Sequence, residues 1–268
     1  MKIDWCMAGG NKKFPGVFYG ISGFPLQLTF MKYISLAMLL PLSVVFSHAD
    51  QLQDRLDARK AEFEKQAPAE KIEAYDNGIK AVIASGMLER ALKEGDTAPD
   101  FTLKNAVGEE VALADLVKSG PVVLTWYRGS WCPYCNIALQ AYQKNLAKIE
   151  AAGARFVALT PELPDKSLPT KEKYKLGFEV LTDLNNEVAA KFKIVFKMTP
   201  AVEKAMEDAF GLKSFNGEAY DRSTLPLSAT YIIRPDGKIS YAFLDAEYRN
   251  RATPEMILTE LEKMKQTR

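Results

Sequence analysis

A Cys-x-x-Cys sequence, Cys132 to Cys135, stands between an apolar run and a segment with helical features. The run 122–127 is typical of a buried strand, and residues 135–152 are expected to form a helix that ends at Gly153. Thiols on the first turn of a helix lie near free backbone N–H groups and the positive end of the helix dipole, which stabilise a thiolate. The two-residue spacer also lets the sulphurs meet. This pattern predicts a strand–turn–helix unit that carries out thiol–disulfide exchange.

The composition is that of an ordinary soluble globular protein, with 47% hydrophobic and 26% charged residues among 268. The net charge of +1 gives no electrostatic support for a nucleic-acid partner. The sequence lacks a glycine-rich phosphate loop, a dinucleotide fingerprint and an internal repeat. We therefore expect one large domain with appendages, and neither a cofactor nor a metal.

Residues 31–49 have the features of a secretory signal peptide, with a lysine, an apolar core and small residues before a cleavage site after Ala49. Because this leader starts at Met31, we interpret residues 1–30 as a non-native extension. We expect the mature protein to be exported, to the periplasm, without stable membrane association. An uncleaved membrane anchor is the alternative, although an apolar run of about 15 residues is short for a full span.

Cleavage after residue 49 would change the chemistry that is available. It would remove the only histidine, His48, and one of the three cysteines, Cys6. A mature chain without histidine excludes Ser-His and Cys-His mechanisms. It also excludes a zinc site with four Cys and His ligands, because one Cys-x-x-Cys supplies half of such a site.

The rest of the chain divides into a helical extension, 50–94, and a main domain, 95–268. The extension is predicted to form two or three helices, broken near Pro68 and Gly86, that cap the main domain; a coiled-coil or dimerising arm is the alternative. In the main domain a loop rich in proline follows residue 160, and other segments alternate between strand and helix. The expected strands are 101–103, 110–113, 122–127, 155–160, 178–181, 229–233 and 239–243. The expected helices are 135–152, 171–176, 185–192, 199–210 and 254–265. This order predicts an α/β sandwich with a mixed sheet.

Four segments in this order resemble the AhpC/TSA peroxiredoxin-like family, in its CxxC-bearing branch. They are residues 95–103, 128–136, 225–237 and 245–251. The resemblance implies a thioredoxin-like three-layer sandwich with a mixed β-sheet. It also implies a thiol peroxidase with an antioxidant role, which reduces hydrogen peroxide or alkyl hydroperoxides through a dithiol/disulfide cycle. A thioredoxin-like reductant and a possible homodimer follow from the same resemblance.

The active-site motif departs from the ordinary peroxiredoxin pattern, which has a proline seven residues and a threonine or serine three residues before the peroxidatic cysteine. Counting back from Cys135 gives Cys132 and Arg128, and counting back from Cys132 gives Gly129 and Thr125. The arginine that leads the late strand in the family is also absent, with Ser228 in its place. The expected redox role is therefore better supported than the expected oxidant.

The resemblance to thioredoxin-like CxxC sites makes Cys132 the attacking thiolate and Cys135 the resolving thiol. The opposite assignment stays open, because the family's threonine position coincides with Cys132. Arg128 is the nearest candidate for a cation that stabilises the thiolate, and Pro226 is the candidate for the cis-proline of thioredoxin folds. Arg249 and Arg251 are more distant candidates for this cation, but solvated ion pairs are the favoured interpretation of both. Glu162 follows the strand 155–160 and is interpreted as a loop acid, with a place near the site as the alternative. Trp131 and Tyr134 are expected to shield the disulfide, with simple packing as the alternative.

Two other functions compete with the peroxidase. One is an exported thiol–disulfide oxidoreductase that acts on protein disulfides without peroxide chemistry. The other is a binding or structural protein in which the disulfide is inert. The inert disulfide is disfavoured, because so small a loop contributes little stability.

Overall fold

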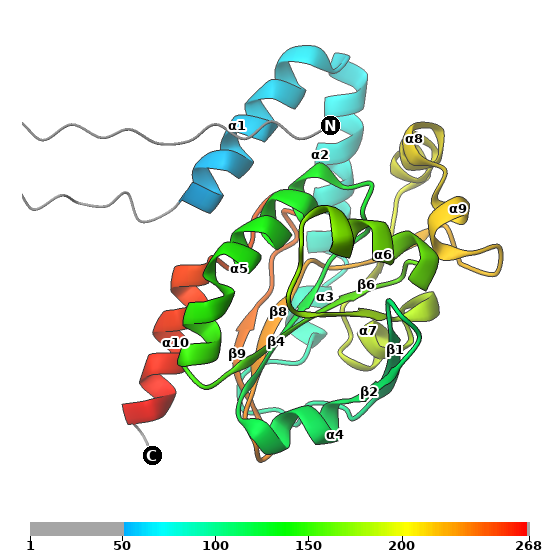
Figure 1. The fold of residues 1–268 in the computed structure, drawn as a ribbon. Helices are drawn as coiled ribbons and strands as arrows, with labels where there is room; N and C mark the ends of the chain where they lie inside the picture. Colours follow the sequence, from blue (N-terminus) through cyan, green and yellow to red (C-terminus); the bar gives the residue numbers. More distant parts are fainter. Residues whose placement is uncertain (1–50, 267–268) are drawn as a thin grey trace, which may run out of the picture. The chain divides into compact units, whose positions relative to one another are not determined.

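The structure, a computed structural model, describes residues 51–266 (Figure 1). The expected extension, 1–30, and the expected leader, 31–49, lie outside the described residues. Within 51–266, no helix combines the length and the apolar character that crossing a membrane requires.

The segment before the main domain is helical, as predicted. It forms α1 (Gln51–Gln66), α2 (Ala69–Ala84) and the short α3 (Met87–Arg90). Pro68 immediately precedes α2, and Gly86 joins α2 to α3 with a φ of 66°, a conformation that glycine adopts without steric cost. The two predicted breaks are therefore confirmed.

The centre of the main domain is a seven-stranded mixed sheet with the order β2-β1-β5-β4-β3-β8-β9. Strands β5, β4 and β3 are parallel to one another, and the remaining pairs are antiparallel. The strands are β1 (Thr102–Asn105), β2 (Glu110–Ala112), β3 (Val122–Trp126), β4 (Arg155–Thr160), β5 (Glu179–Thr182), β8 (Thr230–Ile233) and β9 (Ile239–Phe243). The predicted strands are thus all present, with small shifts at their ends.

Apolar side chains cover both faces of this sheet, because every residue of β3 is buried and successive side chains point to opposite faces. Val123 belongs to the core that includes α5 (Pro133–Ala151) and α10 (Pro254–Gln266), which lie side by side in Figure 1. Val122 belongs to a second core that includes α7 (Glu187–Lys191). The predicted three-layer α/β sandwich is confirmed. Shorter helical pieces complete the main domain: α4 (Leu113–Leu116), η1 (Val117–Ser119) and η2 (Leu184–Asn186).

Two features of the main domain differ from the prediction. The helix expected at 171–176 is α6 (Pro164–Lys173), which begins with Pro164 in its first turn and contains Pro169. The prolines of this segment favour a loop in the sequence, yet a proline is also favoured at the first position of a helix, where the N–H group has no helical partner.

The second difference is a small sheet of β6 (Val195–Lys197) and β7 (Thr224–Pro226), which was not predicted. The insertion between these strands holds α8 (Pro200–Phe210), expected at 199–210, and α9 (Leu212–Asn216). Helix α8 packs against α2, so the insertion and the helical extension meet (Figure 1).

Candidate active site

The Cys-x-x-Cys sequence forms the predicted turn between β3 and α5. Cys132 is the N-cap residue of α5, and Cys135 lies in its first turn behind Pro133. Two hydrogen bonds hold the turn: the Cys132 N–H donates to Gly129 O (3.1 Å), and Asn136 Nδ2 donates to Ser130 O (2.7 Å). Both cysteines are free thiols with 0% of their surface exposed.

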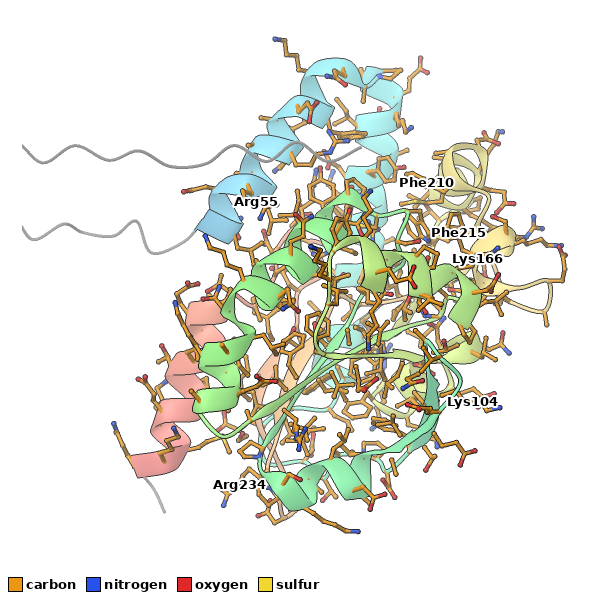
Figure 2. All side chains as sticks on the ribbon, in the orientation of Figure 1. Arg55, Lys104, Lys166, Phe210, Phe215 and Arg234 are labelled. Atoms are coloured by element: carbon orange, nitrogen blue, oxygen red, sulfur yellow. The ribbon has the colours of Figure 1, made fainter. Side chains whose placement is uncertain are left out.

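Gly129 allows the Trp131 indole to fold back over the turn. A Cβ atom at position 129 would lie 2.1 Å from Trp131 Nε1, closer than any real contact, so a larger residue would displace the ring. The indole also packs against Phe210 of α8, which is labelled in Figure 2, with ring centroids 5.0 Å apart. Trp131 therefore joins the cysteine turn to the insertion.

Each cysteine sulphur accepts a hydrogen bond from a buried arginine. Arg128 Nη2 lies 3.0 Å from Cys132 Sγ, and Arg251 Nη2 lies 3.4 Å from Cys135 Sγ. The structure thus brings Arg128 to the sulphurs, as expected. The interpretation of Arg251 as a solvated ion pair is wrong, because the residue is 3% exposed and turns inward from the loop before α10.

The surroundings of the two sulphurs favour the thiolate at Cys135. Burial opposes its ionisation, but hydrogen bonds and charges outweigh this effect and hold the pKa of Cys135 well below its ordinary value. The groups responsible are the Cys132 thiol, the guanidinium groups of Arg251 and Arg128, and the Arg128 main-chain N–H. Burial and the hydrogen bond to Cys135 raise the pKa of Cys132. The surroundings thus favour ionisation of Cys135 over that of Cys132.

Aromatic rings fix the Arg128 guanidinium. Its central carbon lies 4.0 Å from the centroid of the Tyr248 ring and 5.3 Å from that of Trp131, so the cation sits within cation–π range of both. Tyr248 in turn makes an edge contact with Tyr134, with centroids 5.6 Å apart. Trp131 therefore contacts the Arg128 guanidinium directly, and Tyr134 packs against the Tyr248 ring that also contacts it.

Arg249 connects the loop before α10 to the helical extension. It pairs with Glu247 (2.5 Å) in its own loop, with Asp76 of α2 (3.3 Å) and with Glu64 of α1 (4.0 Å). Its side chain is only 5% exposed, so these ion pairs are partly shielded from water. The interpretation of Arg249 as a solvated pair is wrong in this respect, since it fastens α1 and α2 over the site.

A cavity of about 280 Å³ lies above the cysteine turn, between the helical extension and α8. Arg128 and Pro133 line it from the side of the turn, and most other walls are aromatic or apolar. The remaining lining residues are Arg59, Phe63, Lys71, Tyr75, Trp131, Tyr134, Met206, Ala209, Phe210 and Tyr248. The cavity gives a small molecule room next to the guanidinium that holds Cys132.

Pro226 is not the cis-proline that was expected. No cis peptide bond occurs among the described residues, and Pro226 ends β7, where it pairs with Val195. It lines a second cavity together with Arg128 and Ser228, so it lies near the site without the expected geometry. The expectation was wrong because the segment before β8 is occupied by the small sheet, in which a trans proline fits.

Glu162 is the functional candidate that the sequence underrated. It was interpreted as a loop acid, yet it is 0% exposed and its Oε1 accepts hydrogen bonds from the N–H (2.8 Å) and Oγ (2.6 Å) of Ser130. Its position directly after β4, next to the strand that leads into the cysteines, was the signal available in the sequence.

No cluster of three or more potential metal ligands occurs within residues 51–266.

Comparisons with known proteins identify the family of the main domain. A profile described as "AhpC/TSA family" matches residues 95–242, which is more than half of the chain. The chain belongs to the AhpC/TSA family. Among curated relatives of this family member, Peroxiredoxin Bcp of Escherichia coli K12 is 28% identical over 159 residues, covering 59% of this chain and 90% of the relative. The chloroplastic Peroxiredoxin Q of Oryza sativa subsp. japonica is 28% identical over 176 residues, covering 66% of this chain and 68% of the relative.

The fold of this AhpC/TSA chain is also that of solved peroxiredoxin structures. Peroxidoxin BcpB from Mycobacterium tuberculosis matches with a TM-score of 0.53 and 21% identity, over 65% of this chain and 98% of that one. The thioredoxin-like peroxiredoxin fold is therefore confirmed. The relatives support an oxidoreductase of the thiol peroxidase class.

Proposed function

We propose that this protein is a thiol peroxidase that reduces a hydroperoxide through a dithiol/disulfide cycle of Cys132 and Cys135. The observation that carries the proposal is the pairing of two buried sulphurs with two buried guanidinium groups, at 3.0 and 3.4 Å. A buried cation stabilises the thiolate that attacks peroxide, and it also stabilises the negative charge that develops on the leaving oxygen.

In the proposed cycle the Cys135 thiolate attacks the terminal oxygen of the hydroperoxide. The S–O bond forms as the O–O bond breaks, which gives a sulfenic acid and an alkoxide that takes a proton. The Cys132 thiol then attacks the sulfenic sulphur, and water leaves as the disulfide forms. An external dithiol reduces the disulfide by exchange, which restores both thiols and is itself oxidised.

The resemblance to thioredoxin-like CxxC sites makes Cys132 the attacking sulphur, and that assignment is the alternative. The hydrogen bonds and charges around Cys135 support the opposite order. The substrates proposed are hydrogen peroxide and alkyl hydroperoxides, and the proposed reductant is a thioredoxin-like dithiol. The cavity of about 280 Å³ is lined by Arg128, which contacts Cys132, and it has room for a small hydroperoxide near the buried sulphurs.

An oxidoreductase that acts on protein disulfides is less well supported. Such an enzyme has to present a sulphur to a disulfide in another protein, and both sulphurs here are 0% exposed. A peroxide needs a smaller opening to reach these sulphurs than a folded protein does, and a thioredoxin-like reductant would need the larger opening in the second half of the cycle.

The test is rapid-mixing oxidation of the reduced protein by hydrogen peroxide and by an alkyl hydroperoxide. We expect oxidation much faster than that of free cysteine, with disulfide formation that is lost in both Cys132→Ser and Cys135→Ser. A sulfenic-acid probe should label Cys132→Ser and leave Cys135→Ser unlabelled; the reverse pattern would establish Cys132 as the attacking residue. Oxidation no faster than that of free cysteine, together with reduction of insulin disulfides, would replace the peroxidase with the oxidoreductase.

We also propose that the mature protein is exported after cleavage following residue 49. The support is the leader pattern in the sequence, 31–49. N-terminal sequencing of the protein from the periplasmic fraction should begin at Asp50. A protein that begins elsewhere, or that stays in the cytoplasm, would contradict the proposal.

A further inference from the structure

Glu162 is a buried carboxyl group that is only half satisfied. Its Oε1 accepts both hydrogen bonds from Ser130, while its Oε2 is buried and, among residues 51–266, makes no hydrogen bond of ordinary geometry; the buried Tyr127 hydroxyl faces the carboxyl group. Leaving a carboxylate oxygen buried and unpaired is costly, and such groups are rare in folded proteins. The residue therefore needs an explanation beyond that of a loop acid.

The contacts of Glu162 connect it to the turn that carries the cysteines. Ser130 lies two residues before Cys132, and its carbonyl group accepts the hydrogen bond from Asn136 that closes the turn. Glu162 thus holds the turn from the far side, across the ends of the neighbouring strands β3 and β4. Loss of the carboxyl group would free both the N–H and the hydroxyl of Ser130.

Two titratable groups face Glu162: Tyr127, which follows β3, and Cys135 of α5. The other polar groups around it are the Ser130 and Thr160 hydroxyls; the Thr160 hydroxyl accepts from the Glu162 main-chain N–H (3.4 Å). Burial raises the pKa of Glu162 to about 6, the hydrogen bonds from Ser130 and the Tyr127 hydroxyl oppose this rise, and the charge of Cys135 adds to it. Because the influence of two charges is mutual, an ionised Glu162 disfavours the Cys135 thiolate by the same amount.

We propose that Glu162 is a positioning residue of the redox reaction, which anchors the turn through Ser130 and alters the ionisation of Cys135 by gaining or losing its own proton. This inference rests on the proposed function, because it assigns a role at the same pair of sulphurs. With Glu162 neutral, Cys135 ionises more readily. With Glu162 charged, its negative charge offsets part of the stabilisation that Arg251 gives to the Cys135 thiolate. The pair then titrates as a unit, in two steps that belong to neither residue alone.

The test measures the ionisation of Cys135 without peroxide, so that it is independent of the peroxidase proposal. The rate of alkylation by iodoacetamide is followed against pH in the Cys132→Ser background. We expect two inflections with Glu162 present, one of them near pH 6. In Glu162→Gln we expect a single inflection, with the thiol midpoint lowered by on the order of one unit.

Two further variants separate charge from anchoring. In Ser130→Ala the Glu162 carboxyl group stays but loses its hydroxyl donor, so the lower inflection should move to higher pH. Glu162→Asp keeps a carboxyl group and should keep two inflections. Asp165→Asn, which removes an exposed acid of α6 with 66% of its side chain accessible, is the matched control and should leave the profile unchanged. A profile that is the same for Glu162→Gln, Ser130→Ala and the parent would overturn the proposal, whatever the peroxide kinetics show.

Discussion

Replacing Arg251 by glutamine removes the cation beside Cys135 and keeps a polar side chain of similar length. The N···S distance of 3.4 Å corresponds to an attraction of about 5 kcal/mol at an effective dielectric constant of about 20. Desolvation of both groups offsets much of this attraction, and a hydrogen bond to a charged group contributes about 1.5–3 kcal/mol net. At about 1.4 kcal/mol per unit, the pKa of Cys135 should rise by about 1–2 units in Arg251→Gln.

The assay is a pH titration of the thiolate by ultraviolet absorbance, combined with the peroxide oxidation rate below the midpoint. There each unit of pKa removes about nine-tenths of the thiolate, so the rate should fall about 10- to 100-fold. Arg251→Lys keeps the charge without the planar fork and should lose only part of this effect.

The comparison variant is Arg128→Gln, which removes the cation beside Cys132. If the thiolate midpoint is unchanged in Arg251→Gln but rises in Arg128→Gln, the assignment of the thiolate to Cys135 is refuted. That outcome would restore Cys132 as the ionised residue.

Further predictions concern the helical cover and the buried acid. Arg249→Met removes the ion pairs that hold α1 and α2 over the site. A loss of about 1–2 kcal/mol from this attachment should speed labelling of the cysteines by a bulky maleimide about 5- to 30-fold. An unchanged labelling rate would show that these ion pairs do not hold the two helices in place. Gly78→Ala places a Cβ atom 2.7 Å from Val202 Cγ2, so urea denaturation should reveal a loss of about 1–3 kcal/mol. The pKa of Glu162 is raised from 4.5 to about 6 in the folded protein, so its contribution to stability is complete below pH 4.5 and is lost as the pH rises to about 6. Between pH 4.5 and 6 the parent protein should lose about 2 kcal/mol of unfolding free energy through this group, and Glu162→Gln should lack this loss.

The sheet was predictable because its strands are locally distinct. The runs 122–127 and 155–160 are apolar throughout, as strands covered on both faces require, and Asp236-Gly237 marks the last hairpin. Strands β6 and β7 were missed because their pairing spans the whole insertion, and no short turn connects them. Their existence depends on long-range packing that local patterns do not encode.

The active site was predictable only where its residues are neighbours in sequence. Arg128 lies four positions before Cys132, so a shared turn could be expected. Arg251 reaches Cys135 from a segment 116 positions away, and charged residues in loops are usually solvated. Glu162 was underrated for the same reason, because burial is a property of the assembled layers. A signal for Arg251 was present in the resemblance of residues 245–251 to the same family branch.

The burial of both sulphurs has a kinetic consequence. Neither sulphur lines the cavity beside Arg128, so a peroxide needs a small opening between this cavity and the cysteines, whereas a dithiol carried by another protein has to touch the disulfide itself beneath the covering helices. The two halves of the cycle therefore depend on openings of different size, a small one for the peroxide and a displacement of the covering helices for the reductant. At saturating peroxide, we expect the frequency of that displacement to set the turnover, and the oxidised protein to accumulate while it waits for its reductant.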